Sequence, residues 1–369
     1  MKIAYIVDDN ISIRTGVSNK IELMINEWKA LGHDVKVYSL RSQNFTSIIE
    51  DAVVVSEFKT NISKFTKFTN QAKNITALEK YLKEYSPDII YIRNMKYYFN
   101  FVSVLKRTAP YIVEINSKDI EESKLNNQLV YYYNKLTRGI LLNNASAFVS
   151  VSHELINDDA FAKFNKPFTV IGNGYNFSDN NMKKRIFNTN IKFVFIGTPH
   201  QIWHGIDTIL NLSKVLTNNE FHIIGFTKNE LLEIDCNFKS NVFAHGYLKH
   251  NESEEIIKNC DIGISTLGLY KKNMQEASPL KSRQYLSLGL PIIIGYDDTD
   301  ISNEKEYILN IGNYEKSVDD NVNKIKDFMN NIEQLDIDTI IEDAKGLLNY
   351  QEKEVKRIEY FKKIINLNK

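Results

Sequence analysis

Residues 1–40, MKIAYIVDDNISIRTGVSNKIELMINEWKALGHDVKVYSL, decide the fold class of this chain. The apolar run KIAYIV predicts a strand, DDNISIRTGVSN a loop, KIELMINEWKALG an amphipathic helix and HDVKVYSL a second strand. Gly32 is expected just beyond the helix, because glycine adopts the left-handed conformation that ends many helices. Strand, helix and strand in this order form a right-handed βαβ unit with parallel strands. The stretch therefore predicts an α/β protein.

The same alternation continues along the chain and then starts again after a polar stretch near residue 180. Strands are predicted at DIIYIR, YIVEIN, ASAFVSVS and FTVIGNGYN in the first half, and at IKFVFIG, FHIIGF, NVFAHGYL, DIGIST and PIIIG in the second half. A single long polar helix is expected over 118–142. We therefore expect a first domain over 1–175, a second over 176–345, and a terminal helix over 346–369 that packs back on the first domain.

Composition excludes several function classes. The chain has 369 residues, with 46 Lys and Arg against 46 Asp and Glu, so a net charge of zero gives no field to attract nucleic acid. The two cysteines, Cys236 and Cys260, provide neither a disulfide framework nor a zinc site. No run approaches the roughly 20 apolar residues that span a bilayer. We expect a cytoplasmic protein, in peripheral contact with the inner face of a membrane.

Ligands of parallel sheets bind beyond the carboxyl ends of the strands, so the loops there are candidate sites. In the first loop, Gly16 would let the backbone approach a ligand and Arg14 would reach an anion or a sugar hydroxyl. The second loop, FIGTPHQIWHGID, follows a strand that ends at Gly197 and places His204 before the next helix. This loop is a candidate phosphate cradle, although it lacks the P-loop and dinucleotide fingerprints.

The third loop, in DIGISTLGLYKKNMQEASPLKSRQYLSLGLPIIIG, is the most informative. Ser278 is expected to cap a helix that has Pro279 at its first position. The N–H groups of Leu280 and Lys281, together with the Lys281 ammonium, would then face a diphosphate. Gln284 lies three residues further on and shares that face of the helix.

In order and spacing, these motifs resemble the retaining glycosyltransferases of family 4, which have the GT-B fold of two Rossmann-like domains. The specific part is E-x7-Q from Glu276 to Gln284, followed by YLSLGLPII, where the family has E-x7-E. The segments VIGNGYN, HGYLKHNESEEIIKNCDIGIST and FIGTPHQIWHGIDTIL resemble further family segments, as does GVSNKIELMINEWKALGHDVKVYSL near the amino terminus. The resemblance covers most of the chain.

The resemblance implies a nucleotide-sugar donor in the second domain and an acceptor in the first. Glu276 would contact the donor sugar, the start of the 280s helix the diphosphate, and Gln284 the ribose. The residues that would bind the donor are Gly197, His204, Gly246, Tyr247, Leu248, Ser278, Pro279, Leu280, Lys281 and Gln284, with the backbone of 246–248 contacting the base. The expected chemistry needs no protein nucleophile, no metal and no cofactor. The sequence departs from the family at Gln284 and His204, where a carboxylate and a stronger cation are usual.

The amino-terminal candidates are less well defined. Glu114-Ile115-Asn116-Ser117 follows a strand and is similar to an E-x-N variant of the family's His-Asp pair, so Asn116 and Glu114 are candidate catalytic residues. Arg93 also ends a strand and, with Arg14 and Gly16, is assigned to the acceptor or phosphate side. Trp28 and Tyr131–Tyr133 are expected to pack in the core, and the acidic run 297–300 to be a solvated loop.

The sequence thus predicts an enzyme that transfers a sugar to a saccharide or a lipid-linked saccharide in surface glycan biosynthesis. Two other classes remain open. A non-catalytic subunit of the same fold, binding sugar or a partner enzyme, fits the replacements at Gln284 and His204. A sugar-nucleotide epimerase shares the fold but carries more acidic and histidine groups. The donor base and sugar, the acceptor and the oligomeric state are not specified by these patterns.

Overall fold

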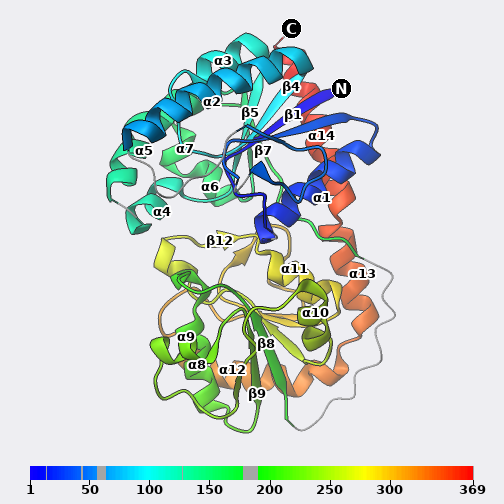
Figure 1. The fold of residues 1–369 in the computed structure, drawn as a ribbon. Coiled ribbons are helices and arrows are strands. Elements are labelled where there is room, and N and C mark those ends of the chain that lie inside the picture. Colours follow the sequence, from blue (N-terminus) through cyan, green and yellow to red (C-terminus); the bar gives the residue numbers. More distant parts are fainter. Residues whose placement is uncertain (14, 43–44, 56–63, 127, 178–189, 369) are drawn as a thin grey trace. The chain divides into compact units, whose positions relative to one another are not determined.

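The computed structural model describes residues 1–368 apart from 14, 43–44, 56–63, 127 and 178–189. The chain divides into two compact units (Figure 1). Unit 1 comprises residues 1–171 and 351–369, and unit 2 comprises residues 172–350. The chain therefore enters unit 2 close to the expected boundary at 175, and its last segment belongs to unit 1.

The described strands of unit 1 form one parallel sheet in the order β3-β2-β1-β4-β5-β6-β7. The strands are β1 (Lys2–Val7), β2 (Asp34–Ser39), β3 (Val53–Val54), β4 (Ile89–Arg93), β5 (Tyr111–Ile115), β6 (Ala147–Ser150) and β7 (Phe168–Val170). The α/β class predicted from the sequence is confirmed. Only β3 was not expected, because two residues carry too little pattern to indicate a strand.

Helices cover both faces of this sheet. They are α1 (Gly16–Ala30), α2 (Lys64–Tyr85), α3 (Phe101–Thr108), α4 (Asp119–Asn126), α5 (Gln128–Asn144), α6 (His153–Asn157), α7 (Asp159–Ala162) and α14 (Tyr350–Leu367). Figure 1 shows α1 and α14 on one side of the strands and α2, α3 and α5 on the other. The expected single helix over 118–142 is divided into α4 and α5, and its two halves pack against each other.

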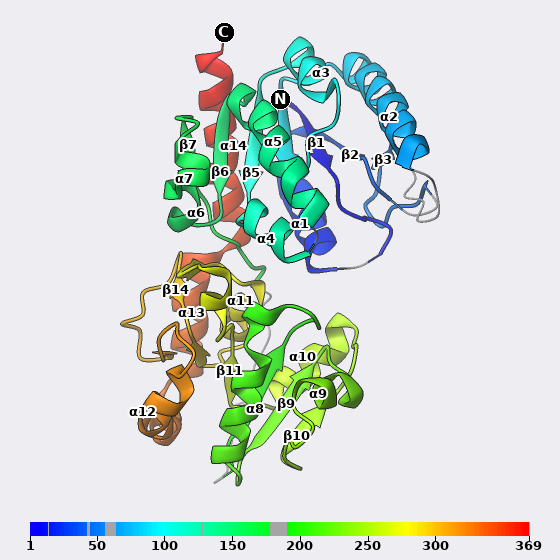
Figure 2. The ribbon, with the colours of Figure 1, turned by 90° about the vertical axis from the view of Figure 1, so that its left-hand side faces the viewer.

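Helix α14 completes the core of unit 1 (Figure 2). Its Glu354 and Arg357 form a buried ion pair, with Arg357 Nε 2.9 Å from Glu354 Oε2. The Trp28 indole donates to Glu354 at 2.7 Å, and Arg357 donates to the Tyr91 hydroxyl at 2.7 Å. Phe361 packs against the rings of Trp28 and Tyr91. Trp28 is thus a core residue, as expected, and its polar N–H finds its partner at the far end of the chain.

The described strands of unit 2 form a second parallel sheet in the order β10-β9-β8-β11-β13-β15, with a small parallel pair β12-β14 beside it. The strands are β8 (Lys192–Ile196), β9 (Glu220–Ile224), β10 (Val242–Ala244), β11 (Ile262–Ile264), β12 (Glu276–Ala277), β13 (Ile292–Ile294), β14 (Asp297–Asp298) and β15 (Ile308–Asn310). Strands β8, β9, β10, β11 and β13 match predicted ones, whereas β12, β14 and β15 were not predicted. Two parallel-sheet units match the predicted GT-B class.

Helices of unit 2 pack around this sheet and an apolar core that includes Phe193, Phe195, Ile209 and Ile264. They are α8 (Ile206–Val215), α9 (Lys228–Ile234), α10 (His250–Lys258), α11 (Leu280–Ser287), α12 (Ser317–Asn331) and α13 (Ile337–Leu348), with short 3₁₀ turns at Ile202–His204, Leu269–Lys272 and Ile332–Gln334. Helix α11 packs against α13 and against β11 and β13, so its position follows from the core.

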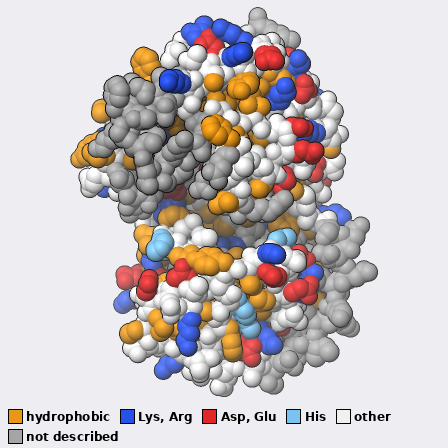
Figure 3. Space-filling model, in the orientation of Figure 1, with side chains coloured by type: hydrophobic (Ala, Val, Ile, Leu, Met, Phe, Trp, Pro, Cys, Tyr) orange, Lys and Arg blue, Asp and Glu red, His pale blue; other side chains and the backbone are white. Residues whose placement is uncertain are grey.

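The exposed face of α5 departs from expectation. Tyr132 and Tyr133, expected in the core, are exposed, and so are Leu129, Leu136 and Ile140 on the same helix. Figure 3 shows hydrophobic side chains at the edge of unit 1 where α5 lies. Aromatic residues at helical spacing usually indicate a buried face, but here the buried positions of α5 include Asn134, Arg138, Leu141 and Leu142. The stripe faces solvent instead.

Candidate functional site

The carboxyl ends of β8, β9 and β10 meet at one edge of the unit 2 sheet. Gly225 has a φ of +87°, and a Cβ there would lie 1.9 Å from the Gly197 carbonyl oxygen, so only glycine permits this approach. The Gly225 N–H donates to the Gly246 carbonyl at 2.7 Å. Gly197 and Gly246, both predicted from the sequence, are thus brought to the same edge, and Gly225 was missed.

His204 is placed at this edge as a neutral imidazole. It is buried, its Nδ1 accepts the Thr198 N–H at 3.4 Å, and its ring meets Phe195 edge-on. Burial, reinforced by the charges of Lys281 and Lys272, lowers the pKa of His204 to about 2. Since Nδ1 accepts, the proton resides on Nε2, so His204 offers an N–H group rather than a positive charge.

Lys281 supplies the charge that His204 does not. Its Nζ lies 4.0 Å from the centroid of the Phe195 ring, and it is buried with no hydrogen-bond partner among the described residues. Burial lowers the pKa of Lys281 to about 7. Gln284, one turn along α11, likewise has a buried Nε2 that hydrogen-bonds to no described group. Unsatisfied buried donors cost free energy, so this helix face is a candidate ligand-binding surface.

The start of α11 lies one residue later than the sequence suggested. Pro279 is the capping residue and Leu280 the first helical residue, so the prediction that Ser278 caps the helix is wrong. Ser278 is buried, and its hydroxyl accepts the Asn173 N–H at 2.7 Å. The N–H groups of Leu280 and Lys281 still belong to the first turn, which has no acceptors within the helix.

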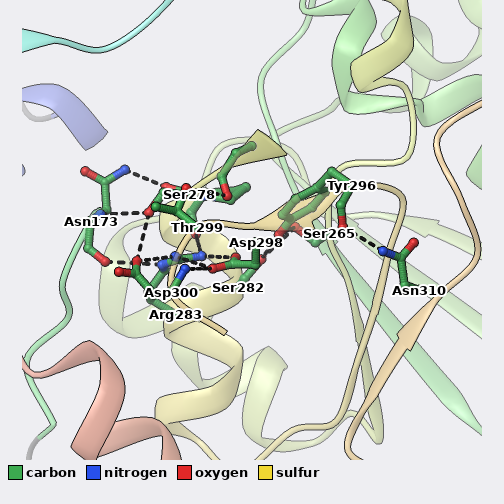
Figure 4. Close-up of polar contacts among 12 residues, drawn as sticks. Asn173, Ser265, Ser278, Ser282, Arg283, Tyr296, Asp298, Thr299, Asp300 and Asn310 are labelled. Carbon is green, nitrogen blue, oxygen red and sulfur yellow. Dashed lines mark hydrogen bonds and ion pairs between the residues drawn. The ribbon is translucent and has the colours of Figure 1, made fainter. Parts of the chain in front are cut away.

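Within the acidic run 297–300, Asp298 and Asp300 anchor α11 (Figure 4), so the expected solvated loop is wrong for these two residues, whereas Asp297 is exposed. Arg283 is fully buried and makes a two-pronged ion pair with Asp298 and a further contact to Asp300 at 2.9 Å. Its Nε donates to the Asn173 carbonyl at 3.2 Å. The partners are 15 and 17 residues away in sequence, and only the fold brings them together. This cluster fixes the helix face that carries Lys281 and Gln284.

The remaining donor candidates lie around the same region of unit 2. Glu276 begins β12, which pairs with β14, and it is half-buried. Tyr247 and Leu248 follow β10; Tyr247 is exposed, and its hydroxyl donates to Glu230 at 2.6 Å. The backbone of Glu276 is therefore held by strand pairing. The side chain of Tyr247 is held by its hydrogen bond to Glu230, in the first turn of α9.

In unit 1, Glu114 lies inside a network of buried charges. Its Oε1 accepts from Lys20 Nζ at 2.7 Å, and its Oε2 from the Tyr5 hydroxyl at 3.2 Å. Although burial raises the pKa of Glu114, the charges of Lys20, Arg93 and Arg357 outweigh burial and hold it at about 2. A fully buried carboxylate with so low a pKa is a poor proton acceptor. This geometry therefore argues against Glu114 as a catalytic base.

Two neighbours of Glu114, Arg93 and Asn116, were candidates from the sequence, whereas Lys20 and Tyr5 were not. Lys20 Nζ also donates to Asn116 Oδ1 at 3.2 Å. Arg93 Nη1 lies 3.8 Å from Glu114, and its Nε pairs with Asp9 at 3.0 Å. Gly16 is the exposed first residue of α1, and Thr15 and Ser18 form the capping box of that helix. Arg14 lies outside the described residues.

Besides Gly225, sequence reasoning missed two lysines. Lys20 is buried in α1, and Lys272 is buried with its Nζ 3.6 Å from the centroid of the Trp203 ring. A lysine at a buried position of an amphipathic helix signals an internal partner, and this signal was present at Lys20. Lys272 carried no such pattern.

The described part of the chain contains no group of three or more His, Cys, Asp or Glu side chains suited to a metal ion. Among the same residues, no helix combines the length and apolar character that a membrane crossing requires.

Known proteins share the fold of this chain. The model of glycosyltransferase family 4 matches residues 14–179. Sucrose-phosphate synthase from Thermosynechococcus elongatus superposes with a TM-score of 0.73 and 12% identity over 99% of both chains. Anabaena HepE in complex with UDP and glucose superposes with a TM-score of 0.67 and 12% identity, over 98% of this chain and 100% of the HepE chain. The catalytic domain of Arabidopsis thaliana starch synthase IV bound to ADP and acarbose superposes with a TM-score of 0.68 and 11% identity, over 99% of both chains. No curated protein sequence matches the chain. The chain has the GT-B glycosyltransferase fold.

Proposed function

We propose that this protein is a retaining, metal-independent glycosyltransferase that moves a hexose-type sugar from a nucleotide diphosphate sugar to a saccharide or lipid-linked saccharide acceptor. The observation that carries the proposal is the face of α11, where Lys281 Nζ and Gln284 Nε2 are buried without partners among the described residues. Lys281, in the first turn of the helix, suits an anion, and the N–H group of Gln284, one turn further on, suits a hydroxyl oxygen.

The chemistry of transfer explains why such a face is useful. As the glycosidic bond breaks, negative charge develops on the departing nucleoside diphosphate. Groups already aimed at that charge stabilise the transition state more than the ground state. Lys281, the N–H groups of Leu280 and Lys281, and the neutral His204 would all bind the diphosphate. Gln284 would bind the ribose, Glu276 the donor sugar, and the backbone of 246–248 the base.

Proteins of the same fold give the proposal its ligand class. Anabaena HepE was solved with UDP and glucose, and starch synthase IV with ADP and acarbose. We place the acceptor on unit 1, where Asn116 and Arg93 end neighbouring strands. In the retaining mechanism inferred from the family resemblance, the acceptor attacks the face that the diphosphate leaves, and a donor phosphate oxygen takes the acceptor proton. No protein nucleophile or cofactor is then required.

The first test is a thermal-shift screen of the purified protein against uridine, guanosine, adenosine, cytidine and thymidine diphosphate sugars. One donor should raise the melting temperature, since a ligand that binds the folded state stabilises it. Glu276→Ala should keep the fold but lose transfer. If no donor shifts the melting temperature of well-folded protein, or if Glu276→Ala retains full activity, the site assignment is wrong.

A non-catalytic subunit of the same fold is the second candidate. Two features favour it: the neutral His204 attracts a diphosphate less than a cation would, and the amide of Gln284 makes weaker hydrogen bonds to ribose hydroxyls than a carboxylate. Turnover of the donor distinguishes the enzyme from the non-catalytic subunit. Release of a nucleoside diphosphate from the bound donor supports the enzyme, whereas binding without release or transfer supports the subunit.

We also propose that the stripe of Leu129, Tyr132, Tyr133, Leu136 and Ile140 on α5 contacts a bilayer surface. Leu129 is 70% and Leu136 81% exposed. The 17 residues of α5 contain no acidic side chain, and Lys135 is exposed beside the stripe, which suits anionic lipid. Tyrosine is typical of the interfacial zone of membranes. A lipid-linked acceptor would reach unit 1 from such a surface.

Flotation with vesicles of phosphatidylcholine and phosphatidylglycerol tests this contact. The wild-type protein should float with these vesicles, and Leu136→Glu should lose most of the bound fraction. Leu367→Glu, at another exposed leucine of unit 1, is the matched control and should bind normally. Equal binding by both variants, or self-association through α5 without lipid binding, would contradict the proposal.

A further inference from the structure

Unit 1 contains two buried N–H donors around one carboxylate. Asn116 Nδ2 and Arg93 Nη1 each lack a hydrogen-bond partner within the described part of the chain. Arg93 Nη1 lies 3.8 Å from Glu114 Oε2, and Asn116 is connected to the same carboxylate through Lys20. Arg93 and Glu114 are paired in register on neighbouring strands, which places both donors at the carboxyl edge of the sheet.

Lys20 determines which end of the Asn116 amide is presented to a ligand. An ammonium group has three donors and no acceptor, so the atom facing it must be the amide oxygen. Lys20 Nζ indeed lies 3.2 Å from Asn116 Oδ1. The amide nitrogen therefore points elsewhere, as a donor. An amide free to turn would present oxygen or nitrogen with similar ease.

Glu114 keeps Lys20 charged in its buried position. Burial lowers the pKa of Lys20, and the neighbouring cations Arg93 and Arg357 lower it further, while Glu114 raises it. These groups come from β5, β4 and α14, and Tyr5 from β1 donates to the other oxygen of Glu114. Without the Glu114 charge, Lys20 would be buried under the influence of two cations, and its neutral form would be favoured.

We propose that the Lys20–Glu114 ion pair is a positioning device that holds the Asn116 amide in one orientation, so that Asn116 Nδ2 and Arg93 Nη1 bind a hydrogen-bond-accepting oxygen of the sugar substrate. This inference rests on the proposed transferase function and adds Lys20 and Glu114 to its machinery as positioning residues. Neither N–H group reaches an acceptor among the described residues: Arg93 Nη1 is 3.8 Å from Glu114 Oε2, beyond hydrogen-bond distance, and no described group accepts from Asn116 Nδ2. A lone-pair oxygen of a sugar completes their hydrogen bonding.

The orientation can be followed without any substrate, from the side-chain amide signal of Asn116 in ¹⁵N-asparagine-labelled protein, assigned by its loss in Asn116→Asp. In Glu114→Gln, a neutral Lys20 amine becomes able to accept a hydrogen bond from Asn116 Nδ2, which turns the amide. The Asn116 signal of this variant should therefore move as pH rises through the lowered pKa of Lys20. It should stay constant in the wild type, in Glu114→Asp, which keeps the charge, and in Lys20→Met/Glu114→Gln, which has no amine to titrate.

Nucleotide release from the donor found by thermal shift gives the second readout. Glu114→Gln should lose kcat progressively as pH rises, about tenfold per pH unit once Lys20 is neutral, while donor KM changes little. Glu114→Asp should restore the wild-type profile. A Glu114→Gln protein whose Asn116 signal and kcat follow pH as in the wild type would overturn the inference. Absence of donor turnover in the wild type would contradict the proposed function instead, and the amide signal would still decide the role of Lys20.

Discussion

Lys20 in unit 1 and Lys281 in unit 2 are both buried lysines at a strand-end site, but they are held differently. Lys20 Nζ lies 2.7 Å from a buried carboxylate and also donates to an amide oxygen. Lys281 Nζ has an aromatic ring 4.0 Å away and no hydrogen-bond partner among the residues described. The first charge is satisfied by the fold and serves to orient a neighbour. The second charge is available to bind a ligand.

The largest expected difference between the two lysines is in the free energy of unfolding. Lys20→Met should reduce the free energy of unfolding by about 3–5 kcal/mol, because it leaves the Glu114 charge buried without its counterion. Lys281→Met should leave stability unchanged or raise it, because it removes an unpaired buried cation. Denaturant unfolding of both variants beside the wild type measures the difference.

The double variant Lys20→Met/Glu114→Gln serves as the control, because removing both charges should recover much of the lost stability. Equal destabilisation by Lys20→Met and Lys281→Met would show that the two lysines are held alike and would break the comparison.

The next effect concerns donor affinity. Lys281→Met should weaken binding of the nucleotide sugar by about 10- to 100-fold, the equivalent of about 1.5–3 kcal/mol for one hydrogen bond to a charged group. Isothermal titration calorimetry measures it. Lys258→Met is the matched control, since that lysine pairs with Glu254 on the surface of α10. A loss of affinity in the control, or none in Lys281→Met, would remove Lys281 from the site.

The smallest effect is a dependence of donor binding on pH. Burial lowers the pKa of Lys281 to about 7, so the free protein carries this charge below pH 7 and loses it above. A bound diphosphate raises that pKa, and binding therefore takes up a proton above pH 7. The dissociation constant of the nucleotide sugar should be flat below pH 7 and rise by up to about tenfold per pH unit above it. The same titration in Lys281→Met should show no such rise.

The sequence predicted the fold class, both sheets and the edge where the ligand is expected, because periodicity is a local property. It failed where partners are distant in the chain. The Asp298 and Asp300 carboxylates look solvated in sequence, and only the packing of α11 puts them on Arg283. Likewise, Glu114 was taken for a possible base because its partner Lys20 lies 94 residues away. The charge state of His204 depends on burial, which no motif reports.

The exposed stripe on α5 is the opposite case, because residues whose spacing predicts burial are exposed. Its aromatic residues follow the spacing of a buried helix face, and the sequence pattern alone assigns them to the core. The buried face of α5 is partly polar, because Arg138 pairs with Asp119 and Asn134 donates to Ser123. Hydrophobic spacing shows that one face is apolar, but it does not show what covers that face.

The return of residues 351–369 to unit 1 has a consequence for synthesis on the ribosome. The first 171 residues lack Glu354, Arg357 and Phe361, on which the Trp28 and Tyr91 side chains depend. The remaining 198 residues, 369 minus 171, take roughly 10–40 s to translate at about 5–20 residues per second. Unit 2, which is continuous in sequence, can complete its core first, and the unit made first is finished last.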